Sequence, residues 1–138
     1  MDFITDRTEA DVLLGNAKGV YSHIDLNRVE NAVAAISEEL SANLGFNVFL
    51  TTKTDWEPTG DFSKESWPTA SQMERYLNNV RCISNIFPSS VLLPTSMSDL
   101  TWRSANNIER TLRYAAECIA AVKSSFQYSG EIYAGEEM

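Results

Sequence analysis

The sequence predicts an all-α protein, because three long segments repeat apolar residues at helical spacing. The longest of them spans residues 98–126, and neither Gly nor Pro interrupts it. Residues three and four positions apart lie on one face of an α-helix, and such a face needs partners of similar length. We therefore expect an antiparallel three-helix bundle with a short N-terminal helix and a long ordered loop. The spacing in this segment alternates between four and three, at Ile108, Leu112, Ala115, Ile119, Val122 and Phe126.

Length and composition predict one domain over residues 1–138, since the chain is long enough to build a single core. An apolar content of 43% and a charged content of 22% are ordinary for a globular protein. The opening residues are acidic and polar, so we expect no secretory signal. No apolar run approaches the roughly 20 residues of a membrane span, so we expect no membrane contact.

The net charge of −8 is distributed unevenly along the chain. Residues 1–67 carry −7, residues 68–128 carry +2, and the last ten residues carry −3. General nucleic-acid binding needs a basic face that displaces counterions, so this acidic balance argues against a nucleic-acid partner. The polarity could serve head-to-tail docking between copies, although a surface that keeps the protein in solution is the simpler interpretation.

The first two helices are predicted from their caps and from apolar spacing. Thr5 or Asp6 can cap a short helix that ends near Gly15. A long helix over residues 25–44 follows, and Gly45 stands where a left-handed residue often ends a helix. Apolar residues three or four positions apart follow one face of the second helix, at Leu26, Val29, Val33, Ile36, Leu40 and Leu44.

A break in the helical period separates the second helix from the third. Thr69 caps the third helix, over residues 69–87, in a capping-box pattern. Residues 46–68 contain Pro and Gly and are predicted to form a long ordered loop, with a short β-strand or an extended arm as alternatives. Loops of this length are often functional or are pinned by their own side chains. Trp56 and Trp67 are the residues that can pin this one.

The last helix has two candidate caps, Ser98 and Thr101. Glu109 and Arg113 are predicted to form an i,i+4 ion pair outside the apolar stripe. Residues 129–138 contain two Gly and three Glu, and we expect them to form a flexible acidic tail that is not helical.

A short motif of the form N-x-[VI]-E-x-x-[VL] occurs twice, in residues 27–33 and in residues 106–112. Both copies lie in predicted amphipathic helices, and two such helices can share this pattern by chance. We interpret it as a packing pattern and not as an internal repeat.

No catalytic, metal or cofactor motif is recognisable. The single histidine, His23, precedes a helix start and has neither a nearby Cys nor an HExxH-type pattern, so we expect no metal site. The neighbouring Glu38 and Glu39 point in different directions and are expected to face solvent. Cys82 and Cys118 are isolated thiols, for which we expect no disulfide. The sequence predicts no enzyme activity and no cofactor.

Two groups of residues are candidates for an interaction surface. Trp56 and Trp67 flank a polar stretch and could form a sugar-stacking platform or a protein-binding anchor, but pinning the loop onto the core is the favoured interpretation. Ile132 and Tyr133 lie among Gly and Glu residues, where they could join a neighbouring subunit or simply remain in water. Trp102 falls in the first turn of the last helix.

Five segments, taken together, cover most of the chain in order and carry a resemblance to a known family. They are ITDRTEADV, DLNRVENAV, W-E-P with WPTASQMERYLNNV, LPTSMSDLTWRSANNIERTL, and SGEIYAGE. This set resembles a family of small proteins and terminal modules encoded in phages and prophages of Gram-positive bacteria. Members of that family are encoded with virion structural genes, near those for tail, baseplate or fibre proteins.

The resemblance implies a structural or attachment role and no active-site residues. We therefore expect a non-enzymatic virion protein that is made in the cytoplasm of the host bacterium and contacts other virion structural proteins, as a homo-oligomer. The alternative function is a carbohydrate- or surface-binding module that uses Trp56 and Trp67. A small regulator with a basic partner would also suit the acidic charge.

Overall fold

Every regular element in the described part of the chain is helical, which confirms the predicted fold class. The computed structural model describes the backbone of residues 2–58 and 68–136, and the side chains of this range up to residue 125. In chain order the elements are α1 (Glu9–Leu14), α2 (His23–Ala42), α3 (Ala70–Ile86), the 3-10 helix η2 (Met97–Asp99) and α4 (Trp102–Glu136). The described part of the predicted loop, residues 46–58, forms neither a helix nor a strand.

The core lies where α2, α3 and α4 meet, since each of these helices contacts the other two. Its residues are those of the predicted apolar stripes. They include Leu26, Val29, Val33, Ile36 and Leu40 from α2, Leu77, Val80 and Ile83 from α3, and Ile108, Leu112, Ala115 and Ile119 from α4. Leu44 and Val122, near the ends of two stripes, are only partly buried.

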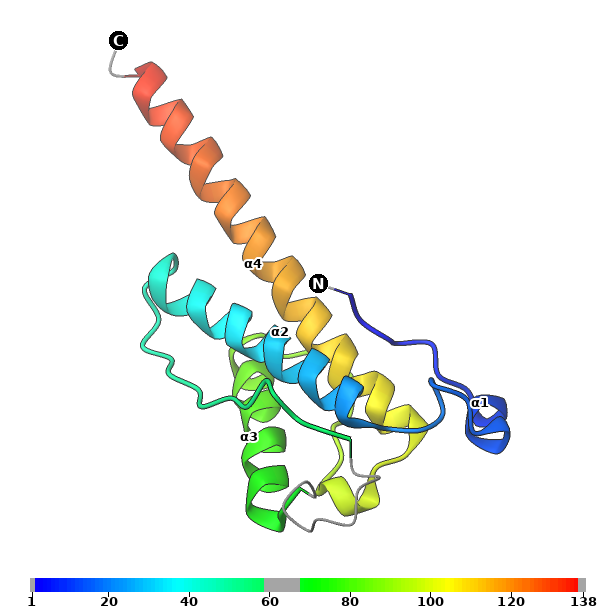
Figure 1. Cartoon of the computed structure of the whole chain (residues 1–138). Helices are drawn as coiled ribbons and strands as arrows, with labels where there is room; N and C mark the ends of the chain where they lie inside the picture. Colours follow the sequence, from blue (N-terminus) through cyan, green and yellow to red (C-terminus); the bar gives the residue numbers. More distant parts are fainter. Residues whose placement is uncertain (1, 59–67, 137–138) are drawn as a thin grey trace.

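The three long helices do not form the expected antiparallel bundle. α2 and α4 lie side by side in the same direction, because Arg28 pairs with Glu109 near their beginnings and Glu39 pairs with Lys123 further along both. Figure 1 shows that α3 also begins at the lower side of the view and ends higher, as α2 and α4 do. The expectation of antiparallel neighbours was therefore wrong.

The connectors explain this arrangement. Ser41, near the end of α2, donates a hydrogen bond to the Val48 carbonyl, and the Trp56 backbone N–H donates to Asn27, near the start of α2. The chain thus runs back along α2 before α3 begins. The connector over residues 87–101 also lies against α3, which η2 contacts. Short loops force consecutive helices to be antiparallel, whereas long connectors that double back do not.

The cap of α1 differs from both candidates. Thr8 caps this helix in a capping box with Asp11, in which each side chain accepts a hydrogen bond from the other residue's backbone N–H. Thr5 and Asp6 lie before the helix, in a segment that contacts α4 and Lys18. A capping box satisfies two backbone donors at once, which neither of the earlier residues does here. Gly15 ends the helix in the left-handed conformation, with φ of 65°.

The other caps agree more closely with the sequence. α2 starts two residues earlier than expected, because Ser22 is its cap and Asp25 is the partner of Ser22 in a capping box. Thr69 caps α3 in the predicted capping box. Of the two candidates for α4, Thr101 is the residue that accepts a hydrogen bond from the Ser104 backbone N–H, at 3.2 Å.

α4 is longer than predicted and includes most of the expected tail. Its backbone remains helical to Glu136, so the expectation that residues 129–136 are not helical was wrong. Glycine inside a helix costs about 1 kcal/mol relative to alanine but keeps its backbone N–H, so Gly130 and Gly135 weaken a helix without breaking it. In Figure 1 the C-terminal part of α4 projects past the ends of α2 and α3.

The core assignment predicts the effect of shortening Leu112, which has no exposed surface. Leu112→Ala should lower the free energy of unfolding by about 2–5 kcal/mol, because the lost methyl groups leave a cavity. Leu92→Ala is the matched control: Leu92 is 81% exposed, so its loss should change stability by less than about 0.5 kcal/mol. Urea unfolding of both variants measures the difference. Equal costs would mean that this face of α4 is not core.

Candidate functional site

A buried polar cluster joins the N-terminal segment to α2 and α4. We call it the Glu109 cluster, and it consists of Arg7, Asp25, Arg28, Asn106 and Glu109. Glu109 has no exposed surface and accepts four hydrogen bonds. Its donors include Arg7 Nη2 and Arg28 Nε, both at 2.7 Å, and the Ile4 backbone N–H at 3.0 Å. This carboxylate therefore ties three separate parts of the chain together.

The charges within the Glu109 cluster balance. Two arginines face two carboxylates, and Arg7 Nη2 bridges Glu109 and Asp25, at 2.7 and 3.1 Å. Burying charged groups is costly unless they are paired and hydrogen-bonded. The hydrogen bonds to Glu109 and Asp25 raise the pKa of the Arg28 guanidinium, so Arg28 stays charged. The cluster thus carries no net charge and holds the N-terminal segment against α2 and α4. Removing any one of its charged side chains would leave a buried charge without a partner.

Asn106 holds the backbone of Arg7 at both of its polar groups. Its side-chain oxygen accepts from the Arg7 N–H, and its side-chain nitrogen donates to the Arg7 carbonyl, both at 3.0 Å. Arg7 is therefore held at two points. Asn106 binds its backbone, and Glu109, one helical turn later, binds its side chain.

A second polar cluster repeats this geometry on α2. We call it the Glu30 cluster, and it consists of Asn27, Glu30, Trp56 and Arg75. Asn27 accepts from the Trp56 N–H at 2.7 Å and donates to the Trp56 carbonyl at 2.9 Å. Glu30 accepts from the indole Nε1 of Trp56 at 2.6 Å and from Arg75 Nη2 at 2.9 Å. One residue of a non-helical segment is again held by backbone and side chain together.

The two clusters coincide with the motif that the sequence repeats. Its apolar positions are buried, as a packing pattern requires: Val29 and Val33 in one copy, Ile108 and Leu112 in the other. In each copy, the Asn binds the backbone of one residue and the Glu binds the side chain of the same residue, and we call these two arrangements Asn-Glu clamps. The interpretation as a packing pattern alone was therefore incomplete. The sequence signal for the clamps is that Asn and Glu both recur beside a core position. A packing pattern alone does not require these two polar residues.

The expected ion pair between Glu109 and Arg113 is wrong. Glu109 is buried in its cluster, and Arg113 instead lies 4.0 Å from Glu117. Helical spacing favours the expected pair, but an exposed i,i+4 pair contributes only about 0.3–0.5 kcal/mol. The approach of Arg7 from the distant N-terminal segment decides the outcome, and periodicity within one helix does not contain that information.

Two tyrosines lie beside the Glu109 cluster. The hydroxyl groups of Tyr21 and Tyr76 share a hydrogen bond, and the Arg7 guanidinium lies 5.6 Å from the centre of the Tyr21 ring. Burial raises the pKa of both phenols, because the charged phenolate is poorly solvated inside the protein. Both hydroxyls therefore remain protonated at neutral pH and belong to the packing of the site.

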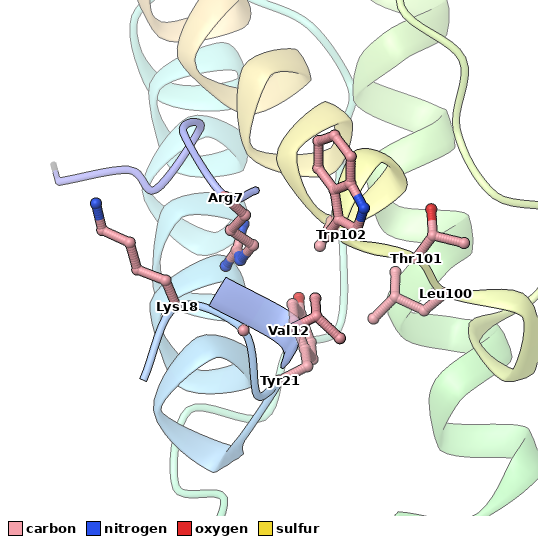
Figure 2. Close-up of a pocket in the computed structure, with 9 residues that line it drawn as sticks. Arg7, Val12, Lys18, Tyr21, Leu100, Thr101 and Trp102 are labelled. Atoms are coloured by element: carbon pink, nitrogen blue, oxygen red, sulfur yellow. The ribbon is translucent and has the colours of Figure 1, made fainter. Parts of the chain in front are cut away.

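A pocket of about 310 Å³ lies on the outer side of Arg7 (Figure 2). Its walls are mainly apolar and are drawn from α1, the segment after it and the start of α4, with Val12, Tyr21, Leu100 and Trp102 among them. Of its two cationic residues, Lys18 pairs with Asp6 at 2.8 Å, and Arg7 belongs to the Glu109 cluster. Arg7 Nε has no hydrogen-bond partner but is buried, so a molecule in the pocket cannot reach it in this conformation.

Of the predicted interaction residues, only Trp56 has a described side chain. It is 5% exposed and holds the loop onto α2 and α3 through the Glu30 cluster, which agrees with the interpretation that it pins the loop. Its buried ring offers no free face on which a sugar could stack. Trp67 lies outside the described residues. Ile132 and Tyr133 lie within α4, in the part whose side chains are not described.

The remaining candidate residues occupy ordinary positions. His23 is the first residue of α2, and Cys82 and Cys118 are free, partly buried thiols on α3 and α4. Among the residues that the structure describes, no group of three or more His, Cys, Asp or Glu side chains could hold a metal ion. Within the same residues, no helix combines the length and the apolar character that crossing a membrane requires.

Comparison with known proteins adds no relative from which a role could be transferred. No family model matches the sequence. No curated protein and no solved structure matches it either. The resemblance to a phage family described above therefore remains an expectation, and the site must be interpreted from its own geometry.

Removing the central charge should unfold the protein more easily. Glu109→Gln should lower the free energy of unfolding by about 3–5 kcal/mol, because Arg7 and Arg28 lose a buried partner. Glu117→Gln is the matched control on the same helix: the Glu117 side chain is 68% exposed, and its loss should cost less than about 0.5 kcal/mol. Denaturant unfolding measures both. A Glu109 variant as stable as the control would contradict the role of the cluster.

Stability should also fall in alkaline solution because of Tyr76. Its pKa is raised in the folded state, so the folded protein retains a proton that the unfolded chain releases above pH of about 10. The free energy of unfolding should therefore be unaffected below that pH and fall above it, by about 1.4 kcal/mol per pH unit for this group. Chemical unfolding between pH 8 and about 12 measures this slope, and Tyr76→Phe should reduce it. An unchanged slope in the variant would assign the alkaline loss to other groups.

Proposed function

We propose that this chain is a non-enzymatic structural component of a phage or prophage particle, which acts by protein–protein contact in a tail, baseplate or fibre assembly. The proposal includes self-association and contact with other virion structural proteins. The sequence resemblance supports the phage setting. Three features of the structure support a role in assembly, and the projecting part of α4 carries most weight.

α4 is much longer than the helices beside it. Its 35 residues correspond to about 52 Å, against about 30 Å for the 20 residues of α2. In Figure 1 its C-terminal part leaves the helices that cover its first half. In the sequence, the helical spacing of the α4 stripe continues past Val122 to Phe126 and, two turns later, to Tyr133. Since helices in proteins depend mostly on packing an apolar face, this part of α4 favours a partner from another chain.

The buried polar groups also favour a structural role. A catalytic carboxylate needs access to a substrate and a proton that it can exchange. Glu30 and Glu109 are instead almost fully buried, and each is saturated by donors of its own chain. Both therefore act as braces for segments that would otherwise be loosely attached.

Apolar side chains near α1 form the third support. Leu13 and Leu14 are 81% and 77% exposed, and Val12, Val20 and Ile24 are about half exposed or more. Single exposed apolar residues are common, but several within one short stretch favour a surface that a partner covers. This surface lies at the opposite end of the molecule from the projecting part of α4 (Figure 1).

The test is the mass in solution, by light scattering, of the intact protein and of a chain ending at Tyr128. The intact protein should be an oligomer, and the shortened chain should have a smaller mass and still unfold cooperatively, because the core lies before residue 123. Leu92→Ser, which alters an exposed residue near the start of α4, is a control that should keep the oligomer. An intact protein that stays monomeric over its accessible concentrations and binds no neighbouring virion protein would overturn the proposal.

A further inference from the structure

We propose that residues 2–8 form an exchangeable arm, and that in an assembly the arm of one copy occupies the clamp of Asn106 and Glu109 on another copy. The partner copy would then supply Arg7 to the Glu109 cluster. This inference rests on the self-association proposed above and adds a second contact between copies, separate from the projecting part of α4. The arm is defined here as residues 2–8, and the acceptor as the first half of α4 with its clamp.

The arm is bound as a separate peptide would be. α4 recognises it mainly through its backbone: Glu109 accepts from the Ile4 N–H, Asn106 pairs with both backbone groups of Arg7, and Arg110 Nη2 donates to the Thr5 carbonyl at 3.0 Å. Recognition of this kind is typical of a bound peptide. An arm of identical sequence from a second copy satisfies every one of these groups equally well. Exchange of an identical element is a low-cost route to association for this reason.

The segment that connects the arm to α2 is loosely attached. α1 contains no buried residue. Polar contacts around it are local, as between Asn16 and Asp11, between Gly19 and Asn16, and between Lys18 and Asp6. The arm and α1 can therefore move together without opening the core formed by α2, α3 and α4. The contacts that must break are those of the clamp, the ion pair between Arg7 and Asp25, and the packing of Phe3 against the core, and a second copy restores all of them.

The same segment also exposes an apolar surface. Val12, Leu13 and Leu14 are exposed on a helix that contributes nothing to the core. If two copies exchange arms, the segment between the arm and α2 of each copy runs from its own helical core to the core of the other copy. The two segments therefore lie close together. The exposed leucines then gain a partner surface, which the closed single chain does not offer them.

The clamp on α2 provides an internal comparison. Its occupant, residues 46–58, is held at several further points, since the Val48 carbonyl accepts from Ser41 and the Thr51 carbonyl accepts from Arg75 and Asn79. This segment follows α2 directly and runs back along it. It cannot move to another copy without separating from both α2 and α3. The same recognition chemistry thus occurs once with a loosely connected occupant and once with a fixed one.

The experiment uses full-length chains in light and heavy isotope forms, mixed in equal amounts, unfolded and refolded together. A photo-reactive amino acid at position 5 labels the contact between the arm and α4, where Thr5 meets Arg110 and Arg113. A second preparation carries it at the exposed position 2, in case the first does not fold. The control carries it at position 52, in the fixed segment. Mass spectrometry then counts cross-links that join a light chain to a heavy one.

Exchange predicts that about half of the cross-links from position 5 or 2 to α4 join light to heavy chains, as random pairing of two equal populations requires. Cross-links from position 52 to α2 or α3 should stay within one chain. If arm cross-links also stay within one chain, the arm does not exchange and the inference is wrong. Light scattering on the same sample separates the two ideas: an oligomer without mixed arm cross-links overturns exchange alone, whereas a monomer contradicts self-association as well.

Discussion

The buried carboxylate of Glu109 is the interaction on which the rest of this structure depends. It receives an arginine from the N-terminal segment, an arginine from α2 and a backbone N–H from Ile4, and it lies on the longest helix of the protein. A buried ion network of this kind adds little net stability compared with apolar packing, because desolvation opposes the Coulomb attraction. What it adds is a specific position for the N-terminal segment. Only one position of an N-terminal segment against α4, whether that segment comes from the same copy or from another, satisfies all of these charges and donors.

The Glu30 cluster shows that this solution is used twice. In both places an Asn fixes the backbone of one residue in a non-helical segment, and a Glu three positions later holds the side chain of that residue. The side chains that are held differ, an arginine in one case and a tryptophan in the other. The common requirement is a donor that can reach a buried carboxylate. The same turn of an amphipathic helix therefore has two roles. Its apolar residue packs into the core, and its Asn and Glu bind a non-helical segment beside the core.

The proposed role in assembly depends on surfaces that neither the core nor the clamps use. The inward faces of α2, α3 and α4 are used by the core, and the polar residues beside that core are used by the two clamps. Two surfaces that neither the core nor the clamps use are the apolar side chains around α1 and the part of α4 that extends past its neighbours. They lie at opposite ends of the molecule in Figure 1, which suits a protein that contacts one neighbour at each end.

The sequence by itself determined the helical class, the core stripes and the cap at Thr69, and it indicated Thr101 as one of two candidate caps and pinning of the loop as the favoured role of Trp56. The class, the stripes and the caps depend on interactions between residues close together in the chain or on a period that one helix imposes, whereas Trp56 was a candidate because large aromatic side chains gain most from burial. Tertiary structure decided the direction of the helices, because the connectors double back along α2 and α3, and it decided the partner of Glu109, because Arg7 is 102 residues away in sequence. It also turned an apparent packing motif into two clamps. An isolated helix exposes its Asn and Glu to water, and only an incoming segment gives those side chains something to hold.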